Sequence, residues 1–337
     1  MNSTFFRNTI VAIILTVFFT YSFYACNKTT TTVPVVNTSS TLAAIIKNSS
    51  TLTILDSALS RTKFLSLLDS ANGGPYTVFA PTDAAFAAAL IADSTIGKMD
   101  TASLRRLVSY HLLAGIEQTS ATITQTLSGP NSPYAAGSVN PTTGKDDTLY
   151  FSVYGSTIYI NGIPITQADV TGVNGVIQAL QNVLIPPTGS LLQTLKSISM
   201  ADTTCSQFTA ALDWASTGST NLDTLLSSGG IFTVFVPNNY AFRTYFGDTL
   251  NVPFASKGLS YDSIANILKY HILQTRQFSP DFAQVAGYPT LLNGDSVYFF
   301  NNGAYLGKTD STGAGFSTTN IMANNGVIHK INAVLTH

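Results

Sequence analysis

Two tyrosine-histidine pairs are the residues best suited to chemistry in this sequence of 337 residues. Tyr110-His111 and Tyr270-His271 each close a stretch whose apolar residues recur at helical intervals, and a histidine can titrate near physiological pH. One interpretation is that the pairs contact a binding partner. The other is that each histidine lies on the inward face of its helix, bonds to a buried loop and fixes the domain.

The remaining acids, nucleophiles and metal ligands form no recognised catalytic pattern. The sequence contains no G-x-S-x-G, H-E-x-x-H or Walker motif, and Glu117 is its only glutamate. A glycosidase needs two facing carboxylates, whereas the adjacent Asp146-Asp147 are typical of a solvated turn. Two cysteines cannot complete a zinc site, and the four histidines lack metal-ligand spacing. We therefore expect no catalytic residue, no cofactor and no dedicated metal site.

The overall composition narrows the class of partner. Only 10% of the residues are charged, the net charge is -1 and no basic run occurs, so nucleic acid is excluded as a partner. Soluble domains usually have roughly 25% charged residues, and here serine and threonine supply much of the polar surface. With 45% hydrophobic residues, the chain can bury two cores of roughly 150 residues each.

One pattern of elements occurs twice. The segment TVFAPTDAAF at 77–86 returns as TVFVPNNYAF at 233–242, with six of ten positions identical. In the first half we expect two or three short helices over 42–68, a strand that ends at Pro81, and an amphipathic helix that ends near the Tyr-His pair. To complete the half, we expect two strands, over 147–155 and 156–165, and a closing run over 174–187. The second half repeats this order, which predicts two copies of one α+β domain.

The repeated motifs resemble the fasciclin-like, or FAS1, domain. They are TVFAPTDAAF, Tyr110-His111 and the closing NGVI…VLIPP at 174–187, with NGVIHKINAVL in the second copy. The resemblance implies two tandem domains, at 41–187 and 188–337, each a β-sandwich-like wedge flanked by short α-helices. The sequence departs from the usual family motifs at two places. Gln178 replaces a histidine that the second copy keeps as His329, and Asn238-Asn239 replace the usual Thr-Asp.

The N-terminal segment predicts export and a lipid anchor. Residues 1–25 combine Arg7 with an apolar run that is too interrupted for the roughly 20 residues of a membrane span. The FYA before Cys26 resembles the lipobox of bacterial lipoproteins, although Phe23 replaces the usual leucine, and the Thr-rich segment 26–40 is typical of a flexible tether. The alternative is an ordinary signal peptide with an accidental cysteine. A lipidated Cys26 leaves Cys205 as a small apolar helix residue.

The aspartates show an unusual sequence context. Eleven of the sixteen are followed by serine or threonine and then by Ala, Leu, Ile, Val or Thr, which resembles the acceptor for protein O-glycosylation in Bacteroidota. The same dipeptides also suit helix caps and turns, so both explanations stay open. The candidate glycan acceptors are Ser57, Ser70, Thr148, Thr224, Thr249 and Ser263.

Together these patterns predict a non-catalytic cell-surface adhesion or binding module. It would be anchored in the cell envelope, at the outer membrane, and would recognise carbohydrate, matrix or another surface protein. One alternative is an envelope enzyme or accessory factor in polysaccharide processing that uses Asp carboxylates. Another is a structural matrix component without a small ligand. The sequence predicts neither the identity of the ligand nor the oligomeric state.

Overall fold

The computed structural model describes residues 39–126, 134–137, 148–201, 203–247, 258–282, 287–292, 294–300, 305–307 and 313–336. The predicted signal peptide, Cys26, Asp146-Asp147 and Thr249 lie outside these ranges. Of the helices within them, none combines the length and the apolar character that a membrane-spanning segment needs.

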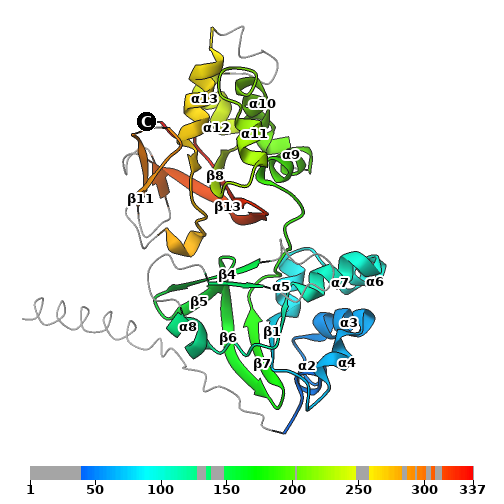
Figure 1. Ribbon diagram of the computed structural model, residues 1–337. Helices are drawn as coiled ribbons and strands as arrows, with labels where there is room; N and C mark the ends of the chain where they lie inside the picture. The colour runs from blue at the N-terminus through cyan, green and yellow to red at the C-terminus, as the bar shows by residue number, and fades with distance from the viewer. Residues whose placement is uncertain are drawn as a thin grey trace, which may run out of the picture. The chain divides into compact units, whose positions relative to one another are not determined.

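The first half begins with helices and ends in a series of strands (Figure 1). Its helical elements are α2 (Leu42–Lys47), α3 (Thr53–Thr62), α4 (Phe64–Leu68), α5 (Asp83–Ala88), α6 (Asp93–Lys98), α7 (Thr101–Ser109) and α8 (Ser120–Thr126). Its strands are β1 (Tyr76–Pro81), β2 (Leu112–Ala114), β3 (Tyr134–Gly137), β4 (Thr148–Tyr154), β5 (Thr157–Ile160), β6 (Ile163–Gly172) and β7 (Gly175–Leu180).

The second half repeats this sequence of elements. Its helical elements are α9 (Leu191–Ala201), η1 (Thr203–Cys205), α10 (Ser206–Ala215), α11 (Leu222–Ser227), α12 (Asn239–Phe246), α13 (Tyr261–Tyr270) and η3 (Ser279–Asp281). Its strands are β8 (Phe232–Pro237), β9 (Ile272–Leu273), β10 (Gly287–Pro289), β11 (Ser296–Phe300), β12 (Tyr305–Gly307), β13 (Ala314–Ala323) and β14 (Gly326–Ile331).

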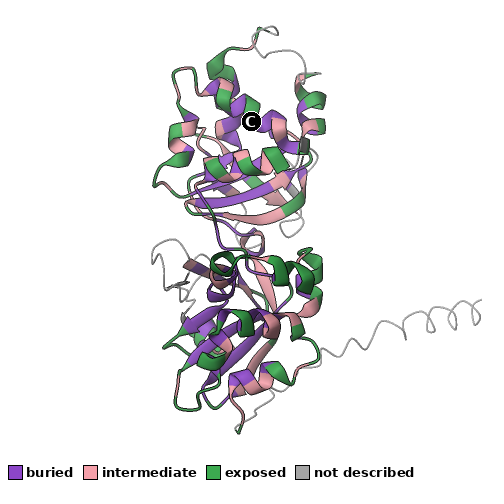
Figure 2. Ribbon diagram, turned by 90° about the vertical axis from the view of Figure 1, so that its right-hand side faces the viewer, coloured by how far each residue is buried: buried purple, intermediate pink, exposed green. Residues whose placement is uncertain are grey.

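Each half contains one mixed sheet built around a parallel pair of strands. The strand orders are β2-β1-β7-β6-β5-β4-β3 and β10-β11-β12-β13-β14-β8-β9. Strands β1 and β7 run parallel from Tyr76 opposite Gly175 to Pro81 opposite Leu180, and β8 pairs with β14 in the same way. All residues of β1, β7 and β8 are buried, as Figure 2 shows for the centre of each sheet. Such strands need a hydrophobic layer on both faces.

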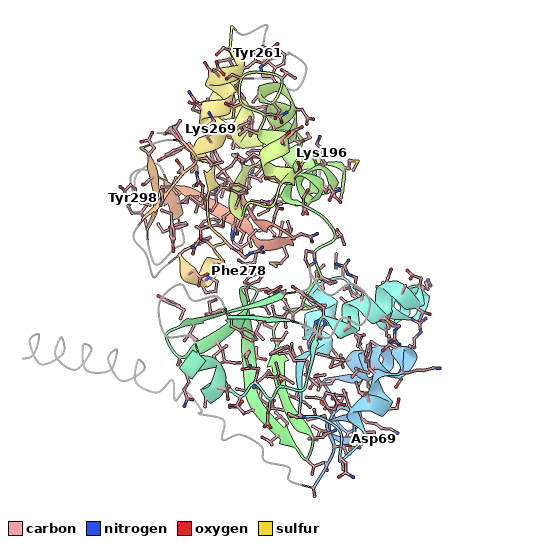
Figure 3. The ribbon with its side chains drawn as sticks, in the orientation of Figure 1. Asp69, Lys196, Tyr261, Lys269, Phe278 and Tyr298 are labelled. Atoms are coloured by element: carbon pink, nitrogen blue, oxygen red, sulfur yellow. The ribbon has the colours of Figure 1, made fainter. Side chains whose placement is uncertain are left out.

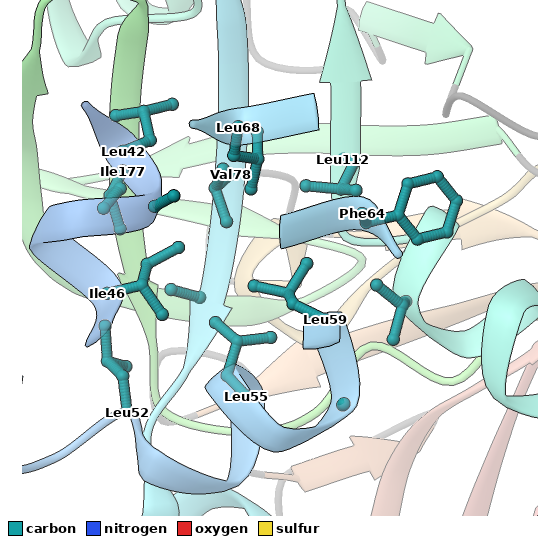
Figure 4. Packing of buried hydrophobic residues seen from close by; sticks show 14 of the residues in the cluster. Leu42, Ile46, Leu52, Leu55, Leu59, Phe64, Leu68, Val78, Leu112 and Ile177 are labelled. Carbon is teal, nitrogen blue, oxygen red and sulfur yellow. The ribbon is translucent and has the colours of Figure 1, made fainter. Parts of the chain in front are cut away.

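The hydrophobic layers on the two faces of the central strands are built from different elements, helices on one face and strands on the other. On one face, helices α2 to α4 pack leucines and isoleucines against Val78 of β1 and Ile177 of β7 (Figure 4). On the other face, the ring centroid of Phe79 lies 5.7 Å from that of Phe151 on β4. Because β4 and β1 are far apart in the strand order, this contact shows that the sheet folds over itself. Phe235 and Phe299 repeat the contact in the second half at 6.2 Å. The expected sandwich-like α+β architecture is therefore confirmed.

The departure at Asn238-Asn239 preserves the hydrogen bonds of Thr82-Asp83. Thr82 and Asn238 each cap a helix by accepting from the backbone N–H three residues later, at 3.2 and 2.8 Å. Asp83 accepts from the first two amides of α3 at 3.2 and 2.9 Å, and Asn239 accepts from an amide at the start of α10 at 2.8 Å. Asp83 thus connects the start of α5 to that of α3, and Asn239 connects the start of α12 to that of α10.

Three local expectations were wrong. The single strand expected over 156–165 is two strands, because Asn161 and Gly162 adopt positive φ values of 50° and 77° and turn the chain between β5 and β6. The chain leaves α7 before His111 and enters β2, so the helix ends earlier than the apolar pattern suggested. Cys205 is buried, as expected, but it ends the short 3-10 turn η1 rather than lying within a helix.

We predict that Gly175→Ala destabilises the first half by at least about 3 kcal/mol. A Cβ at Gly175 would lie 1.9 Å from the carbonyl oxygen of Tyr76, and the glycine has a φ of +146°. Gly97→Ala is the control, because a Cβ there meets nothing within 4 Å, and it should stay within about 1 kcal/mol of wild type. Urea unfolding measures both variants. Equal stabilities would contradict the close approach of β7 to β1.

Candidate functional site

The Tyr-His pairs lie in the interior of each half. Tyr110 and Tyr270 are 0% exposed, and His111 and His271 are 2% and 1% exposed. Each pair lies at the C-terminal end of an amphipathic helix, α7 or α13, at the point where the chain enters a short edge strand. The pairs therefore present their side chains to the core rather than to solvent.

His111 joins two segments of the first half through both ring nitrogens. Its Nδ1 lies 2.8 Å from the carbonyl oxygen of Leu107 in α7, and its Nε2 lies 3.0 Å from the backbone nitrogen of Leu184, beyond β7. Because the amide of Leu184 can only donate, Nε2 must accept and Nδ1 must carry the proton. This assigns a neutral imidazole.

His271 repeats this arrangement in the second half. Its Nδ1 lies 2.8 Å from the oxygen of Ile267, and its Nε2 accepts from the backbone N–H of Leu335 at 2.9 Å. Burial lowers the pKa of both histidines to about 4, and the hydrogen bond to the helix carbonyl opposes this shift. At neutral pH both rings are therefore uncharged and fully engaged.

The tyrosines of the pairs connect the same helices to the strands of the opposite layer. Tyr110 donates its hydroxyl proton to the oxygen of Thr148 at 3.1 Å and accepts from Nδ2 of Asn161 at 2.8 Å. Tyr270 donates to the oxygen of Ser296 at 3.0 Å. Burial, followed by nearby negative charge, raises the pKa of Tyr270 to about 12. Each pair thus links its helix to two places. The histidine binds the segment that follows the closing strand, and the tyrosine binds a strand of the opposite layer.

Gln178 of β7 has a network that explains why a glutamine can replace histidine. Its Nε2 donates to the carbonyl oxygen of Gln118 at 2.9 Å and to Oδ1 of Asp169 at 2.8 Å. Its Oε1 accepts from the backbone N–H of Asp169 at 3.0 Å. The side chain therefore donates two hydrogen bonds and accepts one, all in fixed directions.

His329 occupies the same place on β14 with the same polarity. Its Nε2 lies 3.0 Å from the carbonyl oxygen of Gln277, and its Nδ1 accepts from the backbone N–H of Asn320 at 3.4 Å. The proton therefore sits on Nε2, opposite to the assignment for His111 and His271. Burial lowers the pKa of His329 to about 4 as well. A glutamine amide reproduces this tautomer and adds no titrating group.

Two Asn-Gly pairs, Asn174-Gly175 and Asn325-Gly326, form the turns before β7 and β14, and their asparagines also bind helix ends. Asn174 accepts from the first amide of α2 at 2.9 Å and donates to two carbonyl oxygens at the end of α4, at 2.8 and 3.1 Å. Asn325 does the same for α9 and α11, at 2.7, 3.0 and 2.8 Å. Each asparagine therefore fastens two helix ends to the start of the closing strand.

The predicted glycan acceptors differ in exposure. Ser70, Thr224 and Ser263 are exposed, whereas Ser57 and Thr148 are half-buried. Several aspartates of the Asp-Ser/Thr pattern lie at the N-terminal ends of helices, where a negative charge or a capping oxygen is stabilising. Asp100 caps α7, and Asp223 and Asp262 lie in the first turns of α11 and α13. The local structure thus accounts for part of the Asp-Ser/Thr pattern without glycosylation.

A surface pocket in the second half contains residues that the sequence analysis did not single out. It has a volume of about 550 Å³ and lies between η1, the first turn of α12 and strands β13 and β14. Among the described residues that line it, Arg243 and Lys330 are the charged ones, and none is a carboxylate. Aligning the two copies could have found these residues, because alanines stand at the equivalent positions, Ala87 and Ala179. Across the described ranges, no group of three or more His, Cys, Asp or Glu side chains could hold a metal ion.

We predict that His329→Gln is tolerated and weakens the pH dependence of stability. Unfolded histidine binds protons below about pH 6.5 and the buried ring only below about 4, so the free energy of unfolding falls as the pH drops between these values. The variant should stay within about 1 kcal/mol of wild type at pH 7 and avoid about 2 kcal/mol of the loss at pH 5.

Urea unfolding of the second half at the two pH values measures this effect. His271→Gln is the comparison variant, because its Nδ1–H tautomer is not matched by a glutamine, and it should be clearly less stable at pH 7. Equal losses in the two variants at pH 7 would refute the assigned tautomers.

Comparison with known proteins identifies the repeated domain. A family model described as the fasciclin domain matches residues 50–186 and 203–337. Transforming growth factor-beta-induced protein ig-h3 of Sus scrofa is 29% identical over 184 residues, which cover 54% of this chain and 24% of that protein. Stabilin-2 of Mus musculus is 25% identical over 293 residues, which cover 81% of this chain and 10% of that protein.

Other matches include a bacterial surface protein and a solved domain pair. The cell surface glycolipoprotein MPB83 of Mycobacterium bovis is 28% identical over 148 residues, which cover 43% of this chain and 60% of that protein. A FAS1 domain pair from the insect cell adhesion molecule Fasciclin I covers 85% of this chain and 96% of its own, with 21% identity and a TM-score of 0.37. This chain spans only part of the length of each of the three relatives. Because the family model matches both halves, the resemblance is confirmed and this protein belongs to the fasciclin domain family.

Proposed function

We propose that this protein is a non-catalytic binding module of the cell surface that recognises carbohydrate, matrix or another surface protein. The observation that carries the proposal is the engagement of both ring nitrogens of His111 and of His271 within the core. Residues that are used to hold the domain together are not available as acids, bases or ligands. In this proposal the Tyr-His pairs fix the scaffold, and recognition takes place on the surface.

The surface of the second domain supports recognition of carbohydrate. Its exposed large side chains include Tyr240, Tyr245, Tyr261 and Tyr298, of which Tyr261 and Tyr298 are marked in Figure 3. An exposed tyrosine offers an apolar ring for stacking on a sugar face and a hydroxyl for hydrogen bonds. The ion pairs of Lys196 with Asp213 and Asp223, at 3.0 and 3.6 Å, lie near the surface and contribute little to stability.

Among the described carboxyl groups, that of Asp281 comes closest to a general acid. Burial raises the pKa of its side chain to about 6, and a hydrogen bond from the backbone N–H of Phe278 at 3.0 Å opposes this shift. That hydrogen bond gives the carboxyl a local structural role at the start of η3. A glycosidase would also need a second carboxyl about 5 to 9.5 Å away across a substrate site, and none of the described residues that line the pocket of the second domain is a carboxylate.

The proposal includes attachment to the cell envelope. We infer a lipid anchor at Cys26, in the outer membrane, and glycans at exposed acceptors such as Ser70, Thr224 and Ser263. The similarity to MPB83, which is named a cell surface glycolipoprotein, supports a surface location and both kinds of modification. More than one lipid chain is needed for stable anchoring.

Binding of full-length protein in detergent to an array of glycans and matrix proteins tests the proposed function. We expect retention of at least one ligand and recovery of that ligand at unchanged length by mass spectrometry, because no catalytic carboxylate pair acts on it. Shortened glycans in the eluate would instead support the alternative, an envelope enzyme in polysaccharide processing.

The mass of the protein purified from its native host tests the modifications. It should exceed the peptide mass by lipid and by sugar, and the triple change Ser70→Ala, Thr224→Ala and Ser263→Ala should remove most of the sugar, since these acceptors are exposed. Ser60→Ala, an exposed serine that does not follow an aspartate, is the control and should leave the mass of sugar unchanged. A mass equal to peptide plus lipid alone would rule out the glycans.

A further inference from the structure

The pocket of the second domain is built by backbone-anchored elements. Asn238 caps α12 by accepting from a backbone N–H at 2.8 Å. Asn239 is held by two hydrogen bonds to the start of α10, at 2.8 and 3.0 Å. On the opposite side, the hydroxyl of Ser317 donates to the carbonyl oxygen of Lys330 at 3.4 Å, which joins β13 to β14 at this point. Polar contacts therefore fix the base of the pocket, and its volume of about 550 Å³ is within the usual range of small-ligand sites.

The side chains around this base have a consistent chemistry. Tyr240 and Arg243 lie three residues apart on α12 and so share one face of that helix. Lys330 lies on β14, and Ser317 and Thr318 add hydroxyl groups from β13. Of the described lining residues, the two that carry charge are cations, and the first turn of α12 adds the positive end of the helix dipole. The pocket therefore favours a ligand with negative charge.

The first domain shows that the fold does not require these groups. Ile331 lies opposite Pro237 as Leu180 lies opposite Pro81, so Lys330 corresponds to Ala179. By position after the same prolines, Tyr240 and Arg243 correspond to Ala84 and Ala87. The second domain thus adds two cations and an exposed ring to a scaffold that is otherwise shared.

We propose that this pocket binds the anionic group of an acidic saccharide, either the carboxylate of a uronic acid or a sulfate ester. This inference rests on the proposed binding function and names its ligand class. Arg243 supplies a planar fork of N–H donors that matches a carboxylate or sulfate, and Lys330 supplies a second cation. Tyr240, which is 69% exposed, provides a ring for the sugar face, and the hydroxyls of Ser317 and Thr318 bond to sugar hydroxyls.

Calorimetric titration of the full-length protein in detergent tests the proposal. The probes are a tetramer of galacturonic acid, a sulfated galactose tetramer and the neutral galactose tetramer, each at low and high salt. One acidic tetramer should bind at least about tenfold more tightly than the neutral one, and the difference should shrink at high salt. Comparing the two acidic probes distinguishes carboxylate from sulfate.

Arg243→Ala is the decisive variant, because Arg243 is exposed on α12 and its truncation leaves the hydrogen bonds of the pocket base in place. It should weaken binding of the acidic tetramer at least about tenfold without lowering the melting temperature. Lys98→Ala removes an exposed cation of the first domain and should bind as wild type does.

Each other outcome overturns the inference. Equal affinity for acidic and neutral tetramers, or an Arg243→Ala variant with unchanged affinity, would refute the pocket as the site while the array result still supports a binding module. Inorganic phosphate that competes as well as the acidic tetramer would show a general anion site and refute the saccharide. Failure of every glycan and matrix protein on the array to bind would remove the proposed function itself.

Discussion

The parallel pairing of two strands from opposite ends of each domain is the constraint on which the rest of the fold depends. In the first domain β1 lies beside β7, although the two are separated by most of the domain's sequence, and every residue of both strands is buried. A strand with no exposed face needs cover on both sides. The helices supply one cover, and the sheet, by folding over, supplies the other.

Burial of this pair explains why so many polar side chains lie in the core. Backbone groups at the ends of the buried strands cannot reach water, so they need internal partners. The hydroxyl of Thr77 donates to one carbonyl oxygen and accepts from one amide of the segment after β2, both at 2.8 Å, and Thr233 does the same at 2.7 and 2.9 Å. Asn174, Asn325 and the histidines complete this set. Neutral side chains are the better partners for these buried backbone groups, because a charged side chain in the same position would be costly to desolvate.

The two domains have kept this interior and changed their surfaces. Gln178 and His329 differ in type, yet each donates to a carbonyl oxygen and accepts from an amide of the neighbouring segments. By contrast, equivalent outward positions carry alanine in α5 and tyrosine and arginine in α12. The shared polar core therefore stabilises both domains, and the outward positions can differ without disturbing it.

The sequence by itself determined the repeat, the order of the main helices and strands, and the family, because these follow from local spacing and from motifs within about ten residues. Most of strand β6, from residue 166 onward, was missed because its buried and exposed positions do not alternate. Its pairing with β7 shifts register twice, and Asp169 in it has a φ of 59°. Only the tertiary structure decided the tautomers of the histidines, since each depends on an amide or carbonyl far along the chain. It alone brought Arg243 and Lys330 to one pocket, because their elements meet only when the sheet and its helices pack together.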